Sequence, residues 1–365
     1  MKVGILTFHR AINYGAVLQA YATQQVLISM GHDAYVINYL IPCVENSDRA
    51  PFLPNGKMNL FIHGHIRSWW LYDSNKCNTL KKRKLWDDFL AYRLRLTESC
   101  LQDSIPQDFD AYIIGSDQVW SSYICNGLDP VYWGNFKHPE DSRVIAYAAS
   151  TSVTDMKKQS PDTLCGLMSN FNSISVRDEK VMSFINKELI LNSNYSIPHA
   201  FLTIDPTILG GRNIWDTFTS KHSLPEKYIL YFAARTYKPN PNAIREKAMQ
   251  LADKFGCRVL SINFGEDSPE DFVVKIKNAE AVISSSFHGV AFSLIFNKPL
   301  FAIAYGDEQD SRYVNLLNNI GAQKMIHGID EDLDPDIDFD YDKININIER
   351  LRTASLDYLT KSLNS

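Results

Sequence analysis

Several features that would place a protein in a special structural class are missing from this sequence. No run of about 18 apolar residues occurs, so no segment is expected to span a membrane as a helix. The six cysteines form no C-x-x-C pair, and no cysteine–histidine cluster has zinc spacing. No small-residue cleavage site follows the first apolar run, so no secretory signal is indicated. We therefore expect reduced thiols, no metal site and a cytoplasmic location.

The sequence also lacks an excess of positive charge. Asp and Glu number 42 and Lys and Arg 37, which gives a net charge of -5. A general nucleic-acid binder needs a basic face, so no nucleic-acid partner is expected. Hydrophobic residues make up 45% and charged residues 22%, as in a typical globular protein. A chain of 365 residues is long enough for two domains.

The first 40 residues alternate between strand and helix patterns. Residues 3–8 are continuously apolar, as in a strand that is buried on both faces. Apolar residues then recur every four positions, as on one face of a helix: Leu18, Ala22, Val26 and Met30. Residues 34–39 return as a second strand. This βαβ unit predicts a parallel sheet.

The strand–helix alternation continues and restarts once after a turn at Asp205-Pro206-Thr207. Strands are predicted at residues 111–114, 144–149, 173–176, 201–204, 228–234, 258–263, 281–285 and 300–304. We predict an α/β fold of two Rossmann-like domains with mostly parallel sheets. Residues 1–208 form the first domain, 209–344 the second, and 345–365 a C-terminal helix. A cleft near residues 205–227 is then a natural ligand site.

A strand–turn–helix at residues 283–289 is the strongest local sign of a ligand site. The turn supplies Ser285, Ser286, His288 and Gly289. Free N–H groups at a helix start favour an anion. His288 can therefore bind phosphate or transfer a proton. The alternative is a buried histidine that only caps the turn.

Arginines next to predicted strands are the second sign. Arg177 and Arg235 each follow a strand, and Arg312 lies in a loop or at a helix start. Ligands of open α/β sheets bind beyond the carboxyl ends of the strands, and arginine binds carboxylate or phosphate as a fork. The alternative is that each arginine pairs with a nearby acid, such as Asp178 for Arg177.

Two further loops also follow strands. The first loop offers a titratable ring, a cation, an amide and a phenol: His9, Arg10, Asn13, Tyr14 and Gly15. This set suits a polyhydroxylated ligand, and the loop lacks the G-x-G-x-x-G pattern of a dinucleotide site. After the strand at 111–114, Asp117 can orient a hydroxyl group or cap a turn.

A basic stretch at residues 81–84 has two interpretations. It predicts a solvated helix that packs through Leu85, Phe89 and Tyr92. The alternative is a surface that touches anionic lipid headgroups, as a peripheral protein at the inner face of the membrane would.

Five segments in a fixed order resemble the polysaccharide pyruvyl transferase family. They are Gly4 to Tyr21, Ile114 to Trp120, Ser175 to Asp178, Asp205-Pro206-Thr207, and Pro269 to Gly289. The resemblance covers roughly residues 1–320. It implies a GT-B-like arrangement, with the acceptor side in the first domain and the donor side in the second. It also implies phosphoenolpyruvate as co-substrate, no other cofactor, and a sugar acceptor that is often lipid-linked.

The resemblance implies a pyruvate ketal as product and assigns Arg177 and His288 to the donor. Phosphoenolpyruvate carries about three negative charges, so two or more cations should face it. His288 is the candidate general acid, and His9 or Asp117 the candidate base. Many family members carry Arg where this chain has Ser286, so Arg235 and Arg312 are the candidate substitutes.

Two other functions fit the same features. One is a GT-B-type glycosyltransferase that uses a nucleotide sugar and needs a base and ribose pocket in the second domain. The other is a non-catalytic glycan-binding protein, which the absence of a cation at Ser286 favours.

Overall fold

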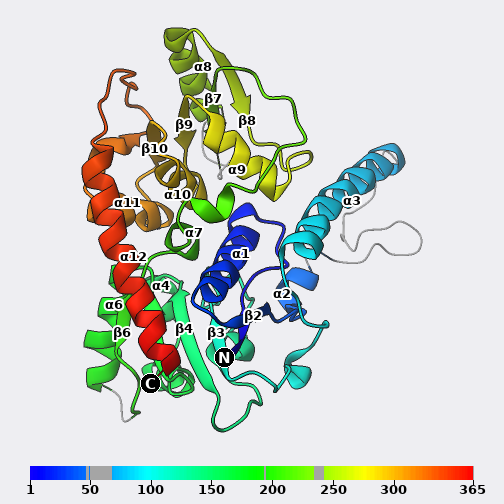
Figure 1. Cartoon of the computed structure of the whole chain (residues 1–365), viewed down its shortest axis with the longest axis vertical. Coiled ribbons are helices and arrows are strands. Elements are labelled where there is room, and N and C mark those ends of the chain that lie inside the picture. Colours follow the sequence, from blue (N-terminus) through cyan, green and yellow to red (C-terminus); the bar gives the residue numbers. More distant parts are fainter. Residues whose placement is uncertain (47–48, 50–67, 193–194, 234–241, 365) are drawn as a thin grey trace.

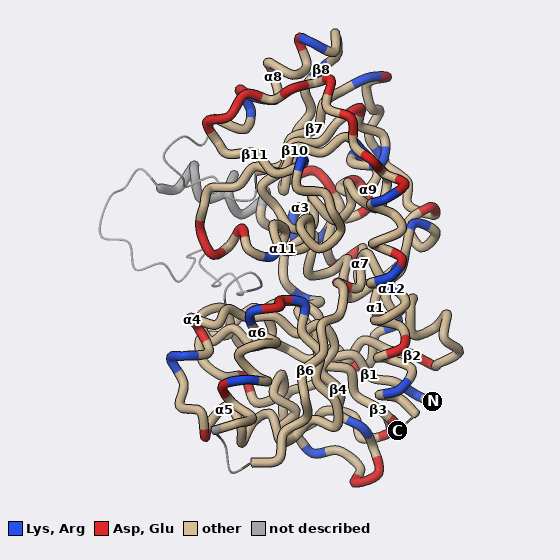
Figure 2. Tube along the Cα trace, turned by 90° about the vertical axis from the view of Figure 1, so that its left-hand side faces the viewer, with Lys and Arg blue, Asp and Glu red and all other residues tan. Residues whose placement is uncertain are grey.

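The chain folds into two α/β domains, each built on its own parallel sheet and stacked one above the other in Figure 1. The computed structural model describes residues 1–46, 49, 68–192, 195–233 and 242–364. The predicted α/β class with two Rossmann-like domains on parallel sheets is confirmed. Lys and Arg alternate with Asp and Glu over both domains in Figure 2, in keeping with the small net charge of -5.

The first sheet has six parallel strands in the order β2-β1-β3-β4-β5-β6. Their bounds are β1 (Lys2–Leu6), β2 (Asp33–Val36), β3 (Ala111–Ile114), β4 (Arg143–Ala149), β5 (Ser173–Val176) and β6 (Ala200–Leu202). The strand order reverses between β1 and β3. The loops that follow these two strands therefore flank the crevice where doubly wound sheets bind ligands.

The second sheet repeats this plan with five parallel strands in the order β11-β10-β9-β7-β8. Their bounds are β7 (Tyr228–Phe232), β8 (Arg258–Ser261), β9 (Ala281–Ser284), β10 (Leu300–Ala304) and β11 (Ile326–Gly328). Here the order reverses between β7 and β9. The turn after β9, which carries His288, therefore lies at the crevice of the second sheet.

Helices cover the faces of both sheets and connect the strands (Figure 1). Their bounds are α1 (Tyr14–Ser29), α2 (Pro42–Glu45), α3 (Ser68–Arg93), α4 (Val153–Met156), α5 (Pro161–Met168), α6 (Glu179–Phe184), α7 (Pro206–Leu209), α8 (Ala243–Phe255), α9 (Pro269–Asn278), α10 (Phe287–Ile295), α11 (Ser311–Asn319) and α12 (Tyr341–Asn364). Among the described residues, no helix is long and apolar enough to cross a membrane.

Helix α1 joins the two domains through its first residue. The ring of Tyr14 stacks on that of Phe272 in α9, with 4.7 Å between centroids and 11° between planes. Its hydroxyl donates to the carbonyl oxygen of Asp267 at 3.0 Å. Burial of this side chain between the domains fixes where the start of α1 stands relative to the second sheet.

Helix α12 returns from the second domain to the first (Figure 1). The Tyr358 hydroxyl donates to the Ala146 carbonyl of β4 at 3.0 Å, and the Ser355 hydroxyl oxygen accepts from the Ile204 N–H at 2.9 Å. These bonds hold α12 against the first sheet and beside the segment that leads out of β6.

The basic helix α3 packs only partly as predicted. Phe89 is buried and Leu85 packs against the core, as expected. Tyr92 was predicted to pack as well, but its side chain is 84% exposed, so that prediction was wrong. Tyr92 lies three residues after Phe89, and on α3 this step brings it out of the buried face. The proposed contact with lipid headgroups stays a prediction.

Candidate functional site

Side chains from both domains meet between the facing ends of the two sheets. Arg177 follows β5 directly, and its Nη1 donates to the Asp205 carboxylate, which precedes α7. His288 comes from the first turn of α10, and its Nε2 lies 3.9 Å from Asp205 Oδ1. Arg177 and His288 therefore share one carboxylate, although they belong to different domains.

Asp205 is the centre of this cluster and has no exposed side-chain surface. Its Oδ1 accepts hydrogen bonds from the Thr207 N–H at 3.0 Å and the Thr207 hydroxyl at 2.7 Å. Burial alone would raise the pKa of this carboxyl group. The charges of Arg177 and His288 and the bonds from Thr207 outweigh burial and hold the pKa below its usual value. Asp205 is therefore an anion that neutralises Arg177.

The imidazole of His288 is largely buried beside the start of α1. A Cβ atom added to Gly15 would lie 1.9 Å from His288 Nδ1, so only glycine allows α1 to approach this closely. Burial is the largest influence on the pKa of His288 and lowers it, while Asp205 raises it and Arg177 lowers it. The net pKa is below the ordinary value, so the ring is neutral near neutral pH.

Several buried donors at this cluster have no hydrogen-bond partner within the described part of the chain. They are Arg177 Nε and Nη2, His288 Nε2 and the Ser285 hydroxyl. A buried donor left unpaired costs about 1–3 kcal/mol, so folded proteins rarely gather several of them. A ligand that brings acceptor oxygens would satisfy them. The cluster is therefore suited to a carboxylate or phosphate group.

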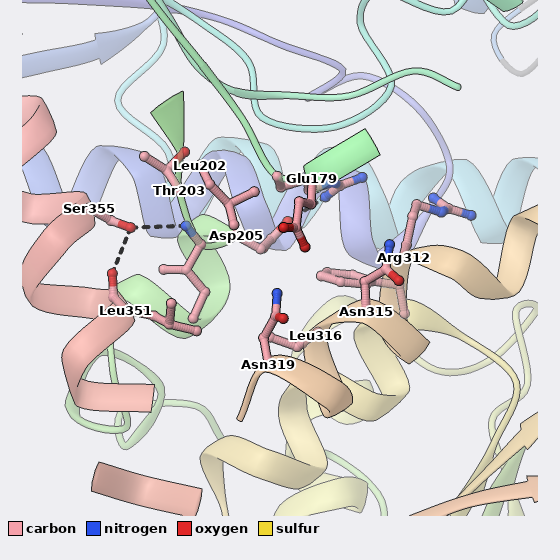
Figure 3. A pocket seen from close by; sticks show the side chains of 13 residues that line it. Glu179, Leu202, Thr203, Asp205, Arg312, Asn315, Leu316, Asn319, Leu351 and Ser355 are labelled. Atoms are coloured by element: carbon pink, nitrogen blue, oxygen red, sulfur yellow. Dashed lines mark hydrogen bonds and ion pairs between the residues drawn. The ribbon is translucent and has the colours of Figure 1, made fainter. Parts of the chain in front are cut away.

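A pocket between the domains opens onto this cluster. Its walls come from the turn after β5, from the segment between β6 and α7, and from α11 and α12 (Figure 3). Arg177 and Arg312 both line it, one from each domain. Arg312 is the second residue of α11, as its predicted place at a helix start required. The Phe287 ring lies 4.9 Å from the Arg177 guanidinium carbon and also lines the pocket.

The first-loop residues lie close together, but their polar groups are engaged within the protein. Both ring nitrogens of the fully buried His9 lie within 3.2 Å of protein oxygens, and burial lowers its pKa to about 4. Arg10 pairs with Glu45. Asn13 caps α1, and Tyr14 and Gly15 make the interdomain contacts described above. Their predicted roles at the acceptor or as a base stay predictions.

The remaining predicted residues lie at the same strand ends, except one. Asp117 Oδ1 is 3.5 Å from Arg177 Nη2. Ser286 is the residue before α10, and its N–H donates to Ser284. A Cβ atom on Gly289 would lie 2.2 Å from the Ser284 hydroxyl oxygen, so glycine lets α10 pack on β9. Arg235 lies outside the described residues.

One group of side chains outside this cluster has ligand types that metals use. His222, Asp267 and Asp271 bring ligand atoms within 4.8 Å of one another. Both carboxylates already have protein partners, because Lys275 Nζ lies 2.7 Å from Asp267 and the Ser268 N–H and hydroxyl donate to Asp271. The two acids therefore stabilise the start of α9 and the loop before it.

The profile of the family described as Polysaccharide pyruvyl transferase matches residues 13–308, which is most of the chain. The chain belongs to this family. No curated protein gives a significant sequence match. The segments that hold Asp117, Arg177, Asp205 and His288 all lie within the matched range.

Several solved structures have a similar fold to this pyruvyl transferase family member, although their sequence identity to it is low. A UDP-GlcNAc 2-epimerase from Methanocaldococcus jannaschii has a TM-score of 0.45 and 13% identity, covering 96% of this chain and 92% of that one. The enzyme of the same name from Neisseria meningitidis has a TM-score of 0.45 and 13% identity, covering 99% and 100%. A Streptomyces glycosyltransferase has a TM-score of 0.38 and 12% identity, covering 98% and 96%.

Sequence reasoning missed two residues of this cluster in the family member. Asp205 was interpreted as part of a turn, although an aspartate directly after a strand in an α/β domain is well placed for a site. Phe287 has no polar group and gave no signal, yet its ring lies against Arg177. The contacts of Asp205 and Phe287 with Arg177 join residues that are 28 and 110 positions apart, which no local pattern reveals.

Proposed function

We propose that this family member transfers a pyruvyl group from phosphoenolpyruvate to two hydroxyl groups of a sugar and forms a pyruvate ketal. The observation that carries the proposal is the meeting of Arg177 and His288, from different domains, at a set of buried and unpaired donors. Family membership supports the transferase class and a sugar or polysaccharide acceptor.

The donor end is proposed to be held by two arginines. Arg177 Nε and Nη2 donate to one oxyanion group of phosphoenolpyruvate, since Nη1 is engaged by Asp205 and Nη2 has only a 3.5 Å contact with Asp117. Arg312 supplies the second cation from the other domain and replaces the arginine that many family members carry at the position of Ser286. Both arginines line the same pocket, so both can face one bound donor.

His288 is proposed to protonate the methylene carbon of the donor. The first sugar hydroxyl then bonds to the adjacent carbon, phosphate leaves with the C–O bond electrons, and the second hydroxyl closes the ketal. Of the two hydroxyl protons, one balances the proton that His288 gave to carbon and the other leaves with phosphate. The pKa of His288 lies below its usual value in the free protein, and a bound anion raises it because it stabilises the imidazolium form. Binding of the donor thus favours the protonated form of His288, which is the form that can act as the acid.

The proposal is tested by which ligand raises the melting temperature. A ligand at 100 times its Kd stabilises the folded state by about 2.7 kcal/mol. We expect stabilisation by phosphoenolpyruvate for the wild type and a smaller effect for Arg177→Lys and His288→Asn. Stabilisation by UDP alone would replace the proposal with a nucleotide-sugar glycosyltransferase. Response to neither ligand would favour a non-catalytic glycan-binding protein. The cytoplasmic location and lipid-linked acceptor stay predictions.

A further inference from the structure

The interdomain pocket continues beyond the arginines into a part that the proposed donor does not explain. Helix α11 forms one wall, and the spacing of Arg312, Asn315 and Asn319 places them on one face of that helix. Figure 3 shows Asn319 pointing from α11 toward Asp205 and Glu179 across the pocket, with Asn315 between Asn319 and Arg312. The pocket therefore has a guanidinium end and an amide end.

The two amides at the far end have nothing to bind within the described residues. Neither Asn315, which is half-buried, nor Asn319, which is exposed, makes a side-chain hydrogen bond there, whereas Asn318 on the same helix is exposed and does not line the pocket. Each amide offers two donors and one acceptor. The carboxylate of Glu179, at the start of α6, faces the same space and adds acceptors only.

Charge and polarity differ between the two ends of the pocket. An anion would be repelled by Glu179 at the amide end, and it is better placed at Arg177 and Arg312. A neutral ligand with many hydroxyl groups can donate to the carboxylate and both donate to and accept from the amides. Leu316 and Leu351 provide apolar surface for the carbon–hydrogen face of a sugar ring.

We propose that the amide end of this pocket is the binding site for the acceptor sugar, with Asn315, Asn319 and Glu179 binding its hydroxyl groups. The inference rests on the proposed function, because it places the acceptor beside the donor site. The first loop is a less suitable acceptor site, because Arg10 is paired with Glu45 and Asn13 caps the start of α1. Sugar recognition then involves the second domain.

The test uses the full chain and four neutral sugars without phosphoenolpyruvate. Methyl glycosides of glucose, galactose, mannose and N-acetylglucosamine are titrated in saturation-transfer difference NMR. Asn315→Ala, Asn319→Ala and Glu179→Gln should each weaken the binding of a glycoside that the wild type binds by about three- to tenfold, as expected for one hydrogen bond. Asn318→Ala is the matched control, since it removes an exposed amide from the same helix, and it should bind as the wild type does.

Three results would overturn the acceptor site. They are no binding of any of these glycosides to the wild type, unchanged binding in the pocket variants, and equal losses in Asn318→Ala. Circular dichroism and melting curves of each variant show whether it is folded. The donor proposal is judged separately by the stabilisation with phosphoenolpyruvate. If that stabilisation is absent while the pocket variants lose glycoside binding, the donor is wrong and the acceptor site stands.

Discussion

At the scale of single residues, the buried pair of Arg177 and Asp205 loses hydration energy on folding but fixes the position of the guanidinium group. Two charges removed from water are stabilising only while they remain paired. Asp205 has no exposed side-chain surface and Arg177 only 3%, so neither charge is compensated by solvent. The pair also holds Nη1 of the guanidinium group, while Nε and Nη2 make no hydrogen bond within the described residues and Nη2 lies 3.5 Å from Asp117.

Replacing Asp205 with Asn should strongly destabilise the protein. The change removes the buried counter-charge of Arg177 and leaves only Asp117, whose Oδ1 lies 3.5 Å from Nη2, so a loss of about 3 kcal/mol is expected. Asp216→Asn is the matched control, because its pair with Lys277 is exposed to solvent and contributes little to stability. Urea unfolding measures both. Equal free energies of unfolding in the two variants would show that Asp205 does not carry this charge balance.

His9 should make stability fall in mild acid. Its pKa is about 4 in the folded state and 6.5 when unfolded, so the unfolded chain binds the proton first as pH falls. Protonation of His9 in the unfolded chain therefore lowers the free energy of unfolding by up to about 3 kcal/mol as the pH drops from about 6.5 to about 4. The gap in unfolding free energy between wild type and His9→Gln should shrink over this range. A constant gap would contradict the buried neutral ring.

At the scale of elements, helix starts determine how the site is assembled. Ser268 and Asp271 form a capping box at the start of α9. Helix α10 begins at Phe287, so His288 lies in its first turn and not in the loop before it. The start of α1 lies against that same turn through Gly15.

Adding one methyl group at Gly15 should disturb His288 directly. In Gly15→Ala the Cβ atom would overlap the imidazole ring, so the ring must move. Overpacking of this kind costs about 1–3 kcal/mol, and a displaced acid should lower turnover by about tenfold or more. Gly166→Ala, in helix α5, is the control because its new methyl group meets nothing closer than 3.8 Å. Loss of turnover in the control alone would contradict this account.

The parts of the fold that could be predicted have local causes. The bounds of β3 and β10 match the predicted residues, because each is a continuous apolar run that is buried on both faces of its sheet. The short edge strand β11 and helix α11 were not predicted as elements, since three residues carry little pattern and α11 mixes asparagines with apolar residues. The predicted arginine and histidine lie together, but the sequence does not show that the carboxylate of Asp205 lies between them, because the three residues come from separate segments that meet only in the folded chain.

At the scale of the whole molecule, the site exists only while the domains keep their relative position. Arg177 belongs to the first domain and His288 to the second, and their separation depends on contacts such as Tyr14 with Phe272. The hydrogen bond from Thr154 to Glu308 at 2.7 Å also joins the domains. Loosening the domains should therefore separate Arg177 from His288 even when neither residue is changed.

Two substitutions of Tyr14 separate packing from hydrogen bonding at the domain contact. Tyr14→Ala removes a buried aromatic ring and should cost about 3–5 kcal/mol in the free energy of unfolding. Tyr14→Phe keeps the ring and loses the bond to Asp267, so about 1 kcal/mol is expected. Denaturant unfolding gives both values. Similar losses in the two variants would mean that the hydroxyl, and not the stacked ring, holds the domains.

The central claim is that Arg177 and His288 face one anion, and a double-mutant cycle on phosphoenolpyruvate affinity tests it most directly. Calorimetry gives the Kd for the wild type, Arg177→Lys, His288→Asn and the double variant. Arg177→Lys keeps the charge opposite Asp205, so the fold is preserved while the fork is lost. Because both groups contact the same ligand, the two changes should be non-additive by about 0.5–3 kcal/mol. Strictly additive effects, or a wild type that does not bind phosphoenolpyruvate, would contradict the shared site.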